Sequence, residues 1–121
     1  MNRIVTIIRF LSRIAGAAAL ALGLAFWTGH AGGLAMVHML AGSALIICLW
    51  SLAIMALIRG RRRLLSAFAI AWGVLVPVFG ILQYQLLLGS LHWLIRLTHL
   101  LMGVSVVMVV ERIAVPERPA P

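Results

Sequence analysis

The chain has 121 residues, of which 64% are hydrophobic and only 10% are charged. Its mean hydropathy is +1.17. A soluble domain carries about 25% charged residues, so this chain has too few polar side chains to cover a surface in water. The lipid bilayer is therefore expected to surround most of it. The formal net charge is +8, but the arginines lie between apolar stretches and not on one soluble face, which argues against binding to nucleic acid.

Four apolar stretches predict transmembrane helices, because each reaches the roughly 17–25 residues that cross the hydrocarbon core. These stretches are residues 10–27, 34–58, 64–88 and 90–110. The connections between them are short, and the last is a tight turn at Gly89–Ser90, so successive helices must be antiparallel. We predict an all-α membrane protein in which residues 1–113 form a single up-down-up-down four-helix transmembrane bundle. Residues 114–121 form a short Pro-rich cytoplasmic tail.

The arginines predict the orientation of the bundle. If the N-terminus is cytoplasmic, only Arg96 lies on the opposite side of the membrane, and the distribution follows the positive-inside rule. The arginines that this orientation places on the cytoplasmic side are Arg3, Arg9, Arg13, Arg59, Arg61, Arg62, Arg63, Arg112 and Arg118. We predict a multi-pass protein of the inner (plasma) membrane with both termini in the cytoplasm.

A short motif occurs in both the second and the fourth stretch. Residues 37–42 read Val-His-Met-Leu-Ala-Gly, and residues 98–103 read Thr-His-Leu-Leu-Met-Gly. In both stretches another histidine lies upstream, at His30 and at His92. A duplicated helical hairpin would explain this pattern.

His38 and His99 are the main functional candidates, because an imidazole inside a bilayer is energetically costly. They lie at about 8 and 13 Å below the outer ends of two helices that are diagonal in such a bundle. Two inward imidazoles at matched depth can ligate one iron from opposite faces of a haem. Gly42 and Gly103 follow each histidine by one turn on the same helix face, and we expect them to leave room for a flat macrocycle. The predicted cofactor is one haem b, with His38 and His99 as its iron ligands.

Three further residues complete the predicted cofactor site. Arg96 lies on the same face as His99, towards the outer surface, where it would pair with a haem propionate. The alternative is that Arg96 extends to the outer lipid headgroups. His30 and His92 are too close to the first pair for a second haem. They are candidates for propionate contacts, a proton path or a second metal, or they are polar residues on a hydrated rim.

These residues, together with Gly80-Ile81-Leu82-Gln83 and His99-Leu100, resemble the membrane b-type cytochromes that are built as four-helix bundles. The layout is similar to one half of a haem A synthase over most of residues 14–112. The resemblance implies haem binding by histidines on the second and fourth helices. It does not extend to haem modification, because haem A synthases pair two bundles and carry a Glu shortly before a ligand histidine. Here both acids, Glu111 and Glu117, lie at the cytoplasmic end.

We therefore predict a bis-His haem b membrane cytochrome that exchanges electrons with a quinone or a partner protein. It would be an electron-transfer protein or subunit more than a stand-alone enzyme, since no nucleophile–base pair or acid pair is present. Its expected partners are the bilayer, haem, a quinone, and other membrane subunits or a second copy. Two alternatives stay open. One is an accessory or assembly subunit whose histidines hydrogen-bond between helices, and the other is a small transporter or proton path.

Overall fold

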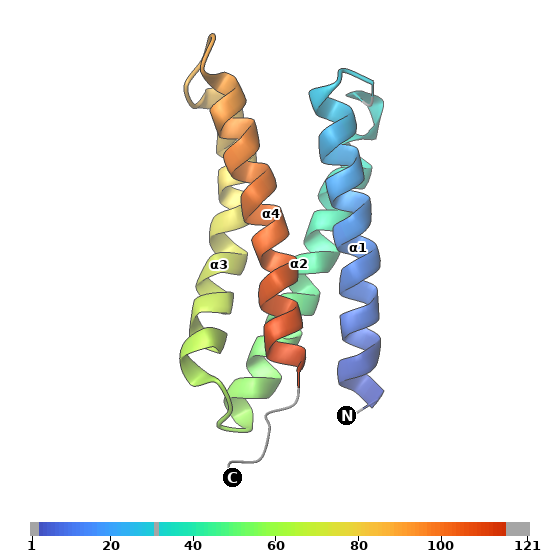
Figure 1. Ribbon diagram of the computed structural model, residues 1–121, viewed down its shortest axis with the longest axis vertical. Coiled ribbons are helices and arrows are strands. Elements are labelled where there is room, and N and C mark those ends of the chain that lie inside the picture. Colours follow the sequence, from blue (N-terminus) through green and yellow to red (C-terminus); the bar gives the residue numbers. More distant parts are fainter. Residues whose placement is uncertain (1–2, 31, 116–121) are drawn as a thin grey trace.

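The computed structural model describes residues 3–30 and 32–115. Its four long helices are α1 (Arg3–Trp27), α2 (Ala35–Ile58), α3 (Arg63–Leu82) and α4 (His92–Ala114), with 3-10 turns at Gly32–Leu34 and Gln83–Gln85. The helices alternate in direction, so that α1 begins and α4 ends at the same end of the bundle (Figure 1). Each helix is long and apolar enough to cross a membrane. The predicted four-helix, multi-pass architecture is confirmed. Most of the predicted tail, residues 116–121, lies outside the described residues.

The four helices pack as two hairpins. The first hairpin is α1 with α2, and the second hairpin is α3 with α4. α2 and α4 contact each other directly, whereas α1 and α3 each pack against both of them. The axes of the two hairpins diverge towards the top of Figure 1 and converge towards the bottom. α2 and α4 are therefore the central diagonal pair, as an up-down-up-down arrangement predicts.

The bundle divides naturally into two halves along its length. We call residues 3–16, 45–76 and 102–115 the termini half, because both ends of the described chain lie there. Residues 17–44 and 77–101 form the hairpin-turn half, which contains the α1–α2 and α3–α4 connections. Almost all of the hydrophobic core lies in the termini half, where Leu49, Val106 and Val110 are completely buried. Among the described residues, Ile95 is the one buried side chain of the hairpin-turn half.

Three helix boundaries differ from the prediction by several residues. α1 begins at Arg3 and not at residue 10, so it includes Arg9 and Arg13, whose guanidinium groups both bind the carboxylate of Glu111 on α4. α4 continues to Ala114 and not to residue 110. α3 ends at Leu82 and not at residue 88, so the connection to α4 is longer than a tight turn. The polar Gln83–Gln85 segment leaves the helix as a 3-10 turn. Gly89, with φ +107°, then takes a left-handed conformation that favours glycine.

Buried positions recur in the two hairpins, which supports the duplication that the histidine motif suggested. Core residues of α2 recur in α4 at the separation that relates His38 to His99. The recurring pairs are Leu45/Val106, Leu49/Val110, Leu52/Ile113 and Ala53/Ala114, all of them buried. The outer helices repeat a pair of glycines at equal spacing, Gly16 and Gly23 in α1 and Gly73 and Gly80 in α3. The recurrence thus extends beyond the histidine motif to both helices of each hairpin.

Candidate functional site

His38 and His99 lie next to each other between the two hairpins. His38 projects from the first turn of α2, and His99 projects from the second turn of α4. The centres of their rings are 6.4 Å apart, and the ring planes are inclined by 58°. Both side chains are half-buried in the hairpin-turn half. The predicted proximity of these two histidines is therefore present in the structure.

The His38 ring is held by the helix that precedes it. Its Nδ1 lies 3.0 Å from the carbonyl oxygen of Ala19 on α1, and its ring meets the ring of Phe26 edge-on at 5.4 Å. Because a carbonyl oxygen only accepts hydrogen bonds, Nδ1 carries a hydrogen in this contact. The imidazole tautomer with its hydrogen on Nδ1 has a free lone pair on Nε2, which is the form that ligates a metal.

The His99 ring packs against α3. It stacks on the ring of Phe79 with centres 6.1 Å apart and an angle of 16° between the planes. Its Nδ1 is buried and has no hydrogen-bond partner among the described residues. A buried polar nitrogen without a partner is costly. This half of the histidine pair is thus incomplete as a purely structural arrangement.

Glycines on the outer helices bring the histidine rings close to the backbone. A Cβ atom added to Gly80 on α3 would lie 2.8 Å from Cε1 of His99, too close for the ring to remain where it is. The equivalent atom on Gly23 of α1 would lie 3.6 Å from Cε1 of His38, at van der Waals contact. The two hairpins therefore build matching half-sites, each with a histidine against a glycine of its own hairpin.

Gly23 and Gly80 differ from Gly42 and Gly103, the glycines that the sequence pattern predicted to lie beside the cofactor. A Cβ atom on Gly42 would meet no atom within 4 Å, and one on Gly103 would meet only Leu20 Cδ2, at 4.0 Å. Side chains on an α-helix lean towards its N-terminus, so each histidine leans away from the glycine that follows it by one turn. The repeated spacing of the glycines in α1 and α3 was the signal in the sequence for Gly23 and Gly80.

The remaining predicted residues do not contact the histidine pair. Nδ1 of His30 lies 3.1 Å from the hydroxyl oxygen of Thr28, and Nδ1 of His92 lies 3.2 Å from the carbonyl oxygen of Leu86. Both contacts are local to a helix connection. Arg96 is exposed on α4, one turn from His99, and within the described ranges it forms no ion pair. It stays available to a ligand.

In the described part of the chain, no group of three or more His, Cys, Asp or Glu side chains is arranged to hold a metal ion. No protein-family model matches the chain, and neither the curated proteins nor the solved structures contain a match. The resemblance to b-type cytochromes is therefore carried by the residue pattern alone, and the function has to be argued from the geometry of the histidine pair.

Proposed function

We propose that this protein is a membrane cytochrome in which His38 and His99 bind one haem b. The distance between the two imidazole rings carries the proposal. A bond between a metal and an imidazole nitrogen is about 2 Å long, and the ring centre lies about 1 Å further away. Two imidazoles that bind one metal from opposite sides then have centres about 6 Å apart, and those of His38 and His99 are 6.4 Å apart.

The surroundings of the pair support the same ligand. The Ala19 carbonyl fixes the tautomer of His38 that leaves Nε2 free, as backbone carbonyls do for metal-binding histidines. Gly23 and Gly80 remove side-chain bulk beside both rings, where a flat tetrapyrrole needs space. Two protein ligands are sufficient, because the macrocycle itself provides the other four nitrogen ligands of the iron.

The residues of the chain would bind and tune the cofactor. When bound, haem iron with two imidazole ligands supplies reversible one-electron transfer. His38 and His99 would fix its position, and the apolar helices would keep the site at low dielectric. Arg96 is the cation nearest in sequence to the pair, and its guanidinium would neutralise a propionate. The arginine distribution supports an orientation in which the termini half faces the cytoplasm. Electrons would be exchanged with a membrane quinone or a partner subunit.

One observation favours a different class of function. The hydrogen bond from His38 to Ala19 joins α2 to α1, and such bonds hold the helices of membrane bundles together. On this basis alone the protein would be an accessory or assembly subunit with structural histidines. This support comes from His38 alone, because Nδ1 of His99 is buried and forms no such bond among the described residues.

The visible spectrum of the purified protein tests the proposal. Protein purified in mild detergent from haem-replete cells should show a sharp Soret band and the low-spin signal of two axial imidazoles. His38→Ala and His99→Ala should each abolish the bis-imidazole signal. His30→Ala and His92→Ala are matched controls that should retain it, because neither side chain contacts the pair. A colourless wild-type protein would overturn the cytochrome and leave the structural role.

A further inference from the structure

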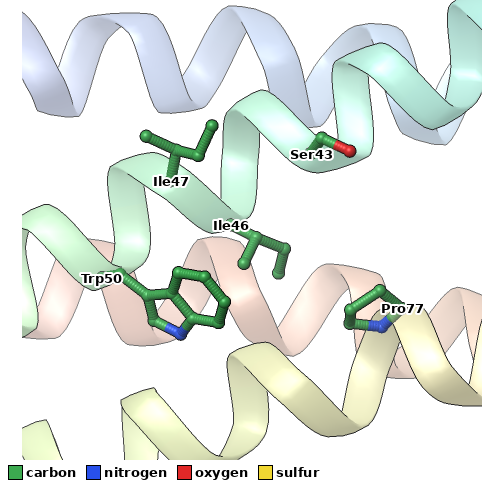
Figure 2. Close-up of a pocket in the computed structure, with 5 residues that line it drawn as sticks. All are labelled: Ser43, Ile46, Ile47, Trp50 and Pro77. Atoms are coloured by element: carbon green, nitrogen blue, oxygen red, sulfur yellow. The ribbon is translucent and has the colours of Figure 1, made fainter.

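A small pocket opens between α2 and α3 on the side of the bundle, about halfway along its length. Its volume is about 190 Å³, and it is lined by Ser43, Ile46, Ile47, Trp50 and Pro77. Figure 2 shows α2 and α3 as its two walls, with the indole of Trp50 and the ring of Pro77 at opposite ends. Ser43, Ile47 and Pro77 are exposed. In a membrane the pocket would therefore open sideways into the lipid.

The pocket lies close to the histidine pair along both of its walls. Ser43 follows His38 on α2 by about 7.5 Å of helix rise. Pro77 precedes Gly80 on α3 by about 4.5 Å, and Gly80 contacts the ring of His99. A molecule in this pocket would thus be about one helical turn from the proposed electron-transfer site.

One polar side chain with a free hydrogen-bonding group lines this apolar site. The hydroxyl of Ser43 can donate or accept a hydrogen bond. The indole N–H of Trp50 is already used, since it donates to the carbonyl oxygen of Ile70 at 3.2 Å. The pocket therefore combines apolar walls with one hydroxyl that can donate or accept a hydrogen bond.

We propose that this pocket binds the head group of a membrane quinone. A volume of about 190 Å³ suits a single substituted six-membered ring, since an apolar cavity of about 150 Å³ holds benzene. Only compounds dissolved in the bilayer reach an opening at this depth. The carbonyl of a quinone would accept a hydrogen bond from the Ser43 hydroxyl, and the hydroxyl of the reduced form would donate one to the same oxygen. A lipid acyl chain has neither group.

This inference rests on the proposed function for the role of the quinone as an electron carrier. Binding of the quinone to the pocket does not itself require haem. A benzoquinone with a decyl tail, titrated into the full-length protein in detergent, should quench the tryptophan fluorescence to saturation, because Trp50 lines the pocket. Ser43→Leu fills the mouth of the pocket and should raise the dissociation constant by about tenfold. Ser51→Leu is the matched control on the same helix, outside the pocket, and should leave the constant unchanged. Equal constants in the two variants would overturn the proposal.

Two further titrations distinguish quinone binding from haem binding and from binding of a lipid acyl chain. The double variant His38→Ala, His99→Ala cannot hold haem between imidazoles, yet it should bind the quinone as the wild type does. A colourless wild-type protein that still binds quinone would therefore overturn the cytochrome alone. Decylbenzene has the same tail and no oxygen atoms. If it competes as strongly as the quinone, the pocket is an acyl-chain groove and the quinone site is wrong.

Discussion

The two halves of the bundle hold their helices together in different ways. In the termini half, aliphatic side chains such as Leu49, Val106 and Val110 are completely buried, and Glu111 binds two arginines of α1. In the hairpin-turn half, the hairpins diverge (Figure 1), and two half-buried histidines lie where the other half has its core. The same helix pair, α2 and α4, is central to both halves.

This difference indicates that one end of the bundle supplies most of its stability and the other end contains the proposed site. Close packing is the main source of helix association inside a bilayer, so the termini half should supply most of the stability of the apoprotein. The hairpin-turn half has the buried Nδ1 of His99, which lacks a hydrogen-bond partner among the described residues, and few buried side chains around it; in the termini half the one such atom, Oγ of Ser66, lies within a close-packed core. A fold anchored at one end can keep such a costly site at the other. The following variants test this division, in order of decreasing expected effect on stability.

Removing a core side chain from the termini half should have the largest effect. Leu49→Ala leaves a cavity among buried neighbours and should cost about 2 kcal/mol. This is the low end of the usual range, because lipid and not water is the reference environment. Ile54→Ala on the same helix, 48% exposed, is the matched control and should cost much less. Thermal unfolding followed by circular dichroism in detergent measures both. Equal losses would show that burial in the core of the termini half does not stabilise the bundle.

Glycine-to-alanine substitutions should have opposite signs in the two halves. A Cβ on Gly73 would overlap with the indole of Trp50, so Gly73→Ala should destabilise the bundle by about 1–3 kcal/mol through overpacking. At Gly42, where the space is open, alanine should stabilise the helix by about 0.5–1 kcal/mol. Unfolding of both variants under the same conditions gives the sign directly. A loss of stability in Gly42→Ala would mean that another molecule fills that space in the purified protein.

The sequence was sufficient to predict the four-helix architecture and the proximity of His38 to His99. Hydropathy and length predict four spans, because the bilayer imposes both on any spanning helix. The sequence was insufficient for contacts that depend on the direction of a side chain or that join residues far apart in the chain. Gly42 and Gly103 were chosen by spacing along one helix, whereas the histidine rings touch Gly23 and Gly80 on neighbouring helices. The pairing of Glu111 with Arg9 and Arg13 likewise joins residues from opposite ends of the chain.

The ion cluster at the termini end should contribute a smaller stabilisation. Glu111 accepts hydrogen bonds from Nε of Arg9 at 2.7 Å and from Nε of Arg13 at 2.6 Å. Glu111→Gln removes the anion and leaves two guanidinium groups facing each other, so the melting temperature should fall by less than in Leu49→Ala. Arg112→Gln, an exposed neighbour on α4, is the control. The difference between the two variants should shrink in high salt. A difference that persists unchanged would show that the charges are not responsible.

The smallest change in stability should accompany a large change at the site. In Gly80→Ala the new Cβ would displace the His99 ring, because 2.8 Å to Cε1 is too close for contact. The ring is the end of a side chain and can rotate aside, so the melting temperature of the apoprotein should change little. The position of the second imidazole would be lost, however, and the bis-imidazole spectrum with it. Gly103→Ala, where the nearest atom is 4.0 Å away, should keep that spectrum if Gly80 and not Gly103 makes room for the cofactor. If instead Gly103→Ala loses the spectrum and Gly80→Ala keeps it, the glycine on the helix of the histidine itself shapes the site, and α3 contributes only packing.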